Sequence, residues 1–345
     1  MSTNANLDVI ARFKNSMVHF YSNGELIYSS KNRIYRITNL QEPEPVIVAE
    51  IPWGLSESVS NCRIIDRYLK NSILRVHRTK KNEYLVSTGK TWWHIDNKGD
   101  ISSIEKFSDT RPMGRGICES KAGITYIAEY NSNPNRGPVK IFRSSDLENF
   151  DVAWEFPPGS IAHVHALIVD PESDNRIWVL TGDTNAESHI HFTDDDFRTL
   201  RLFLSEGQKT RITDLIVRKN DLIWGSDSLR AASILSVDKR SANHISQLHI
   251  LPGPVFYTCR NEAGTLFFGT SPTRIVKSSN YGYIFALRPD NSCREVFRCK
   301  KDSFPQYGII YFPKGILPED FIVFSQVALK PYEGYMIIAR DKSSS

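Results

Sequence analysis

Residues 162–204 read A-H-V-H-A-L-I-V-D-P-E-S-D-N-R-I-W-V-L-T-G-D-T-N-A-E-S-H-I-H-F-T-D-D-D-F-R-T-L-R-L-F-L and contain four strand-like runs. The first two runs, residues 163–170 and 176–181, flank a turn that begins with Pro171 and form a hairpin. The third and fourth, residues 189–193 and 199–204, are joined by a tight acidic turn. Four antiparallel strands in about 40 residues are typical of one blade of a β-propeller, which buries its faces only against neighbouring blades. This stretch therefore predicts a propeller.

Six further groups of strand-like runs can be laid over it. They occupy residues 17–51, 73–107, 116–156, 212–251, 255–298 and 308–338. The group at 255–298 has its third strand predicted at residues 275–278, and the last group is one strand short. Residues 8–13 can supply the missing strand, which would close the ring with strands from both ends of the chain. We predict an all-β fold of seven blades, with six as the alternative, forming one domain over residues 1–345 with disordered tails at 1–7 and 341–345.

Composition narrows the class of protein. The chain has 345 residues, of which 40% are hydrophobic and 24% charged, as expected of a globular protein with a substantial core. Its 43 basic and 39 acidic residues are spread without a basic block, which disfavours a nucleic-acid binder. The start of the chain lacks a secretion signal, and no apolar run is long enough to cross a bilayer. We therefore expect a cytoplasmic protein, while the oligomeric state stays open.

The cysteines agree with that expectation. They are odd in number and scattered, without the spacing of a metal site: Cys62, Cys118, Cys259, Cys293 and Cys299. We predict reduced thiols throughout.

A turn with a shared pattern recurs at blade-length intervals. It begins at Ser144, Thr193, Ser236 and Ser278, and the first three copies carry an aspartate two residues later: Asp146, Asp195 and Asp238. Side-chain to backbone hydrogen bonds from such residues cap tight turns. The pattern resembles the Asp-box of the sialidase-like, or BNR-repeat, β-propellers, including bacterial proteins labelled glycosyl-hydrolase-like. The resemblance implies the propeller fold and a carbohydrate ligand. The R-I-P motif of true sialidases is absent, so sialic acid cleavage is not expected.

Three second strands end beside a carboxylate, at Glu129, Asp183 and Asp227. In a propeller these ends open on one face, around the central funnel. With a turn at residues 171–175, the hairpin register places His163 opposite Asp183, close enough for a hydrogen bond, and His165 on the same side. The preceding hairpin places Arg115 opposite Glu129 by the same reasoning.

These residues suit acid–base chemistry on an acidic ligand. Histidine beside a carboxylate transfers protons at neutral pH, and carboxylates can assist cleavage of a glycosidic bond. We assign catalytic roles to Glu129, His163, His165, Asp183 and Asp227, and substrate contacts to Arg115, Arg136, Arg211 and Tyr257. The alternatives are a structural hydrogen bond for His163 with Asp183 and a plain ion pair for Arg115 with Glu129.

No cofactor is predicted. His189 and His191 share a strand face but lack a third ligand, so no metal site is assigned. The preferred function is a glycoside hydrolase or lyase that acts on an acidic saccharide, and the alternative is a non-catalytic propeller that binds a glycan or a protein.

Overall fold

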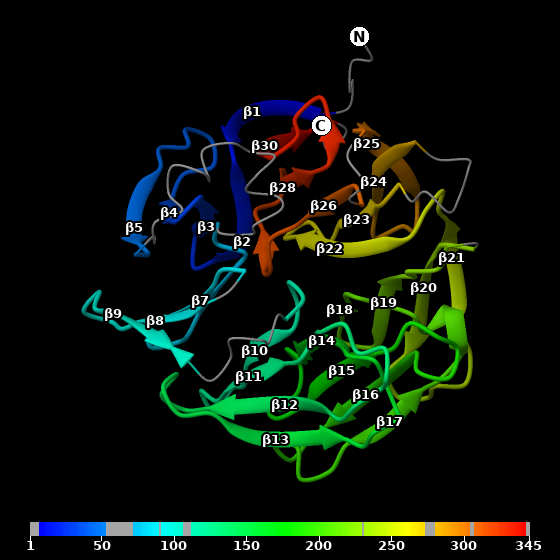
Figure 1. Cartoon of the computed structure of the whole chain (residues 1–345). Helices are drawn as coiled ribbons and strands as arrows, with labels where there is room; N and C mark the ends of the chain where they lie inside the picture. Colours follow the sequence, from blue (N-terminus) through cyan, green and yellow to red (C-terminus); the bar gives the residue numbers. More distant parts are fainter. Residues whose placement is uncertain are drawn as a thin grey trace. The chain divides into compact units, whose positions relative to one another are not determined.

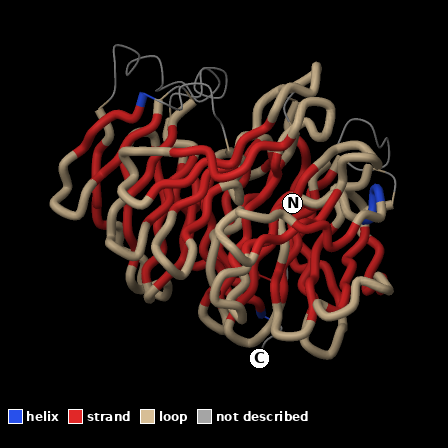
Figure 2. The backbone as a smooth tube through the Cα atoms, turned by 90° about the horizontal axis from the view of Figure 1, so that it is seen from below, coloured by secondary structure: helices blue, strands red, loops and turns tan. Residues whose placement is uncertain are grey.

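The computed structural model describes residues 7–52, 72–89, 91–105, 112–229, 231–272, 280–303 and 307–342. Within these ranges the chain is all-β: strands joined by turns, with a 3₁₀ turn at Gly207–Lys209 and no α-helix (Figure 2). No helix in this part of the chain could span a bilayer.

The strands form seven sheets, antiparallel except for one short parallel strand at the edge of blade six, and these sheets are the blades of a seven-bladed β-propeller (Figure 1). Blade one contains β2 (Ser16–Ser22), β3 (Glu25–Ser30), β4 (Arg33–Ile37) and β5 (Val46–Glu50). Blade two contains β6 (Arg75–Arg78), β7 (Tyr84–Ser87), β8 (Trp92–Ile95) and β9 (Ile101–Ile104). Blade three contains β10 (Ile117–Glu119), β11 (Thr125–Ala128), β12 (Val139–Ser144) and β13 (Asp151–Phe156).

The remaining blades follow the same order along the chain. Blade four contains β14 (Val164–Val169), β15 (Ile177–Thr181), β16 (His189–Thr193) and β17 (Arg201–Leu204). Blade five contains β18 (Ile216–Val217), β19 (Asp221–Gly225), β20 (Ser233–Asp238) and β21 (Ser246–Ile250). Blade six contains β22 (Val255–Asn261), β23 (Leu266–Thr270), β24 (Tyr281–Leu287) and β25 (Cys293–Lys301), flanked by the short strands β27 (Ile316–Leu317) and β29 (Leu329–Lys330).

Blade seven is closed by a strand from the start of the chain. Its order is β1-β30-β28-β26, so β1 (Leu7–Lys14) pairs with β30 (Tyr335–Asp341) outside β28 (Phe321–Val327) and β26 (Ile309–Tyr311). The predicted closure and the preferred count of seven blades are confirmed. Leu7 pairs with Asp341, so both of these residues belong to strands rather than to disordered tails.

The third strand of blade six lies later in the chain than predicted. It is Tyr281–Leu287, and the predicted residues 275–278 lie entirely within the range 273–279, outside the described residues. The Asp-box copy placed at Ser278 consequently precedes the third strand instead of following it. The turn that joins β24 to β25 is capped by Asp290, whose Oδ1 accepts the Ser292 N–H at 2.9 Å.

The Asp-box turns of blades three and four have the expected hydrogen bonds. Asp146 Oδ1 accepts the N–H groups of Glu148 and Asn149 at 2.9 and 2.8 Å, and Asp195 Oδ1 accepts the Thr199 N–H at 2.9 Å. Each turn also holds a buried apolar residue at positive φ, Leu147 at 60° and Phe197 at 66°. These two side chains join the hydrophobic cores on either side of blade three, which anchors each turn to the sheet.

The chain forms two compact units. One comprises Met1–Ile65, Asp227–Ile234 and Gln247–Ser345, and the other comprises Asp66–Ser226 and Leu235–Ser246. In the second unit, apolar cores lie between successive blades, and Trp178 and Trp224 are fully buried there. That residues 1–345 form a single domain stays a prediction.

Candidate functional site

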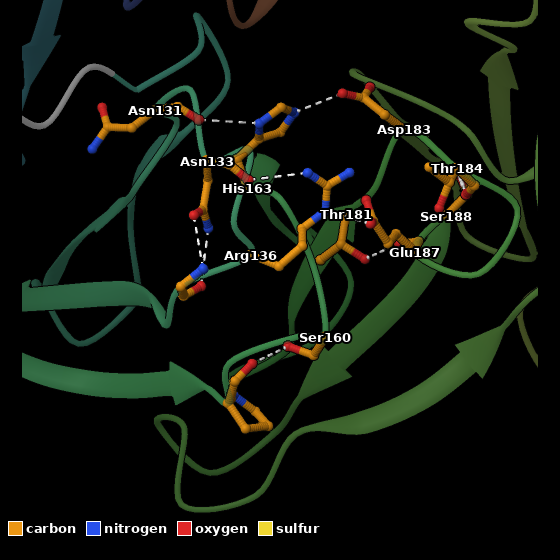
Figure 3. A network of polar contacts seen from close by, with 12 residues as sticks. Asn131, Asn133, Arg136, Ser160, His163, Thr181, Asp183, Thr184, Glu187 and Ser188 are labelled. Carbon is orange, nitrogen blue, oxygen red and sulfur yellow. Dashed lines mark hydrogen bonds and ion pairs between the residues drawn. The ribbon is translucent and has the colours of Figure 1, made fainter.

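The loop that follows β15 positions the Asp183 carboxylate. Gly182 has φ = 91°, and a Cβ there would lie 2.0 Å from the Glu187 carbonyl oxygen, so only glycine fits. The Thr181 hydroxyl donates to the same carbonyl at 2.8 Å, and the Ser188 N–H donates to the Thr184 carbonyl at 3.0 Å. The loop is therefore folded tightly against the end of β15, and Asp183 stands at its start (Figure 3).

His163 and His165 lie at the start of β14, the strand that pairs with β15. The predicted register holds from Ala166 to Val169, and a β-bulge between Val164 and Ala166 then inserts His165 as an extra residue. Val164 consequently pairs with Thr181, so His163 is not directly opposite Asp183 in the ladder. A bulge redirects side chains at a sheet edge, and here both imidazoles reach the Asp183 carboxylate.

The three side chains form one cluster. His163 Nε2 lies 3.2 Å from Asp183 Oδ2, and His165 Nε2 lies 3.4 Å from Asp183 Oδ1. The two Nε2 atoms are 3.1 Å apart. His165 is 1% exposed and His163 10%, while the Asp183 side chain is 37% exposed. Solvent therefore reaches the cluster from the carboxylate side. The predicted contact of His163 with Asp183 and the shared side of His165 are confirmed.

Backbone carbonyl groups fix the orientation of both rings. The Nδ1–H of His165 donates to the Ile212 carbonyl at 2.8 Å. The Nδ1–H of His163 donates to the Asn131 carbonyl at 3.4 Å, a contact drawn in Figure 3. Because a carbonyl oxygen can only accept, each Nδ1 carries hydrogen. In the neutral rings both Nε2 atoms are therefore lone-pair acceptors, and they face each other and a carboxylate.

The surroundings of Asp183 favour its ionised form. A proton on Nε2 lets a ring donate to the carboxylate, and such hydrogen bonds from His163 and then His165 hold the pKa of the Asp183 carboxyl group well below its usual range, against the opposing effect of burial. The Arg211 guanidinium lies 3.4 Å from Asp183 Oδ1. The Tyr130 ring packs over His163, with ring centroids 4.1 Å apart. The cluster thus combines an anionic carboxylate, two oriented imidazoles and an arginine.

Arg115 and Arg136, which were predicted to contact substrate, each form an ion pair with a carboxylate other than Asp183. Arg115 Nε contacts Asp214 Oδ2 at 2.8 Å in a pair that is almost fully buried, so the structure pairs Arg115 with Asp214 where the register suggested Glu129. Arg136 Nε contacts Glu187 Oε1 at 2.6 Å and its side chain is 31% exposed. Sequence reasoning missed Asp214 and Glu187 because both pairs join distant loops, which strand register does not align.

Three further residues were predicted to belong to the site: Glu129, Asp227 and Tyr257. Glu129 accepts the Lys140 N–H at 2.7 Å, and burial raises the pKa of its carboxyl group. Asp227 and Tyr257 belong to the other compact unit, where both are buried. Tyr130, whose ring packs on His163, was not predicted as a site residue. It directly follows Glu129 in the long loop between β11 and β12.

No protein-family model matches the sequence, and no curated protein matches it. Solved structures do match. A structure of a catalytically inactive histidine-to-alanine variant of virginiamycin B lyase from Staphylococcus aureus with quinupristin aligns over 98% of this chain and 96% of its own, with TM-score 0.58 and 14% identity.

Two further structures align over nearly the whole chain. The first is an extracellular domain described as part of a one-component system of B. thetaiotaomicron, with TM-score 0.57 and 12% identity over 99% of this chain and 40% of that longer chain. The second is the CNH domain of AfRom2, with TM-score 0.53 and 8% identity over 97% of this chain and 98% of that one. At these identities the similarity establishes a shared β-propeller fold and carries over no functional residue.

Proposed function

We propose that this protein is an enzyme that acts on an acidic saccharide, with His163, His165 and Asp183 as its acid–base centre. The observation that carries the proposal is the convergence of two imidazole Nε2 atoms, 3.1 Å apart, on one carboxylate that solvent can reach. Three acceptors at such distances repel one another unless a cation lies among them. A proton held between the two Nε2 atoms would supply that charge.

A shared proton gives the pair both roles of an elimination. The unprotonated imidazole removes the proton from the carbon next to the sugar carboxylate, and that electron pair forms a carbon–carbon double bond. The glycosidic C–O bond breaks, and the protonated imidazole delivers its proton to the leaving oxygen. The cluster ends with the same number of protons, while Asp183 stabilises the charged imidazolium throughout.

The arrangement favours a lyase over a hydrolase. Glycoside hydrolysis generally needs two carboxyl groups about 5 to 9.5 Å apart on either side of the bond. The described contacts bring one carboxylate to the histidines, while Glu187 is paired with Arg136 and Glu129 accepts a backbone N–H. Virginiamycin B lyase, which shares the fold, bears the name of the same broad reaction type, but at 14% identity it supports only the fold.

Arginine side chains support an anionic substrate. Arg211 is 20% exposed beside Asp183, and Arg136 is 31% exposed beside Glu187. Guanidinium groups bind carboxylates in a bidentate manner, and an acidic sugar offers such a group. The choice of a saccharide rests on the resemblance of the turns at Asp146 and Asp195 to the Asp-box of sialidase-like propellers.

The test is a screen of uronic-acid and other acidic oligosaccharides for unsaturated products, which absorb in the ultraviolet. Wild-type protein should produce them, and Asp183→Asn should lower kcat by at least about 100-fold, the usual size of one acid–base contribution. Asp195→Asn, in the turn at the other end of the same sheet, is the matched control and should leave kcat unchanged. Binding without any product, unaltered by Asp183→Asn, would instead show a non-catalytic binding propeller.

A further inference from the structure

The cluster of His163, His165 and Asp183 has the ligand types of a transition-metal site. Imidazole nitrogens and a carboxylate suit Zn²⁺ and its neighbours in the periodic table, whereas Mg²⁺ and Ca²⁺ prefer oxygen ligands. One ligand atom from each of these side chains can be chosen so that all lie within 4.8 Å of one another. These ligands are not His189 and His191, the pair that the sequence analysis considered as metal ligands.

The distances match a metal polyhedron. Zinc lies about 2.0–2.2 Å from imidazole nitrogen and carboxylate oxygen, so two ligands at a tetrahedral angle are about 3.3 Å apart. The corresponding distances here are 3.1 Å between the two Nε2 atoms, 3.2 Å from His163 to Oδ2 and 3.4 Å from His165 to Oδ1. A cation can therefore enter with shifts of a few tenths of an ångström.

The hydrogen-bond partners of the two imidazole rings are also typical of a metal site. Histidines that bind metals usually donate their other ring N–H to a carbonyl or carboxylate, which fixes the tautomer. His165 does so to the Ile212 carbonyl and His163 to the Asn131 carbonyl. Arg211 contacts Asp183 Oδ1 in addition and helps to orient the carboxylate. Both Nε2 lone pairs are thus directed inward before any metal binds.

We propose that His163 Nε2, His165 Nε2 and the Asp183 carboxylate bind one divalent transition-metal ion of the Zn²⁺ class. Three protein ligands leave coordination positions free on the side where Asp183 is exposed, as in catalytic rather than structural zinc sites. The inference deepens the proposed function and uses the same centre. An ion held by these three side chains would act as a Lewis acid and lower the pKa of a bound water at that centre.

Metal binding can be measured without any substrate. Protein freed of metal with a chelator is titrated with Zn²⁺ by calorimetry and with Co²⁺ by visible absorption, since the intensity of the cobalt bands distinguishes a low coordination number from the six-coordinate aqueous ion. We expect one equivalent of either ion to bind, no competition from excess Mg²⁺, and an affinity on the order of 100-fold lower in both Asp183→Asn and His163→Gln. Asp183 is exposed enough for its variant to fold, and thermal unfolding of the metal-free variants checks this.

His189→Gln is the matched control. This residue is the first of two histidines on β16 whose ring centroids are 5.3 Å apart, in the same compact unit, and its replacement should leave Zn²⁺ affinity unchanged. Stoichiometric binding that is lost in the cluster variants alone supports the proposal. Absence of binding in the wild type, or loss of binding in His189→Gln but not in Asp183→Asn, overturns it.

The two proposals fail separately. Metal binding at the cluster with no product from any acidic oligosaccharide supports the metal site and contradicts the function. Full turnover by protein that binds no Zn²⁺ contradicts the metal site and leaves the proton-sharing histidines as the acid–base centre.

Discussion

At the scale of a single residue, the His191 imidazole links stability to pH. It packs on β16 against Phe156 and His189, with ring centroids 6.0 and 5.3 Å away, and its Nδ1 has no hydrogen-bond partner among the described residues. Burial, and to a smaller extent His189, lowers the pKa of His191 to about 4. The unfolded chain therefore binds a proton at His191 more tightly than the folded protein does. As a result, the contribution of the neutral ring to the free energy of unfolding is fully present above the unfolded pKa near 6.5 and falls as the pH drops toward 4.

We predict that His191→Phe weakens this dependence. Between pH 7 and pH 4.5, the wild type should lose on the order of 2 kcal/mol more unfolding free energy than the variant. Urea unfolding of both proteins at the two pH values measures the difference, in which acid effects from other groups cancel. Equal losses in the two proteins would show that the ring is already hydrated in the folded state.

Part of the candidate site was predictable residue by residue. A hairpin register read from Pro171 brought His163 close to Asp183, because cross-strand neighbours follow from turn position. The bulge at His165 and the carbonyl partners of both rings were not predictable, since they depend on backbone geometry and on the loops at Asn131 and Ile212. Long-range pairs such as Arg115 with Asp214 leave no local signal in the sequence.

At the scale of the element, the Asp-box turn is a capped structure whose energy can be measured. Asp146 accepts two backbone N–H groups through Oδ1, the Asn149 side-chain amide through Oδ2, and the Ser144 hydroxyl. We predict that Asp146→Ala lowers the free energy of unfolding by about 1 kcal/mol, as loss of a side-chain cap typically does. Glu148→Ala, at an exposed position of the same turn, should change it by less than about 0.5 kcal/mol. Chemical unfolding measures both, and equal effects would mean that the aspartate is not the capping group.

Strand prediction failed where apolar runs compete. Residues 275–278 and Tyr281–Leu287 both have apolar, strand-like composition, and periodicity alone does not rank them. The turn after β24 contains Asp290 and Asn291, with Asn291 at φ = 65°, and this pair of turn-forming residues was the available signal.

At the scale of the whole molecule, the number of blades followed from counting strands. A blade has a nearly fixed length, so seven groups of runs in 345 residues predicted seven sheets, which the structure has. The missing strand of the last group also identified the closing strand. The count was robust because an error in a single strand, such as the third of blade six, leaves the number of groups unchanged.

The closing strand provides the last prediction. β1 pairs with β30 along its whole length, Arg12 lies over the Tyr332 ring at 4.6 Å, and Leu7 is buried. Deleting residues 1–14 removes this strand and exposes the unpaired edge of β30, which can pair with another chain. We expect a loss of at least about 2 kcal/mol of unfolding free energy, the value of one buried apolar side chain, together with self-association.

Deletion of residues 1–6 is the matched control, because it leaves β1 intact from Leu7 onward. Thermal unfolding and size-exclusion chromatography compare the two truncated chains with the full one. If closure by β1 stabilises the fold, only the longer deletion unfolds early and elutes as larger species. Identical behaviour of both deletions would show that blade seven is stable as the three strands β30, β28 and β26.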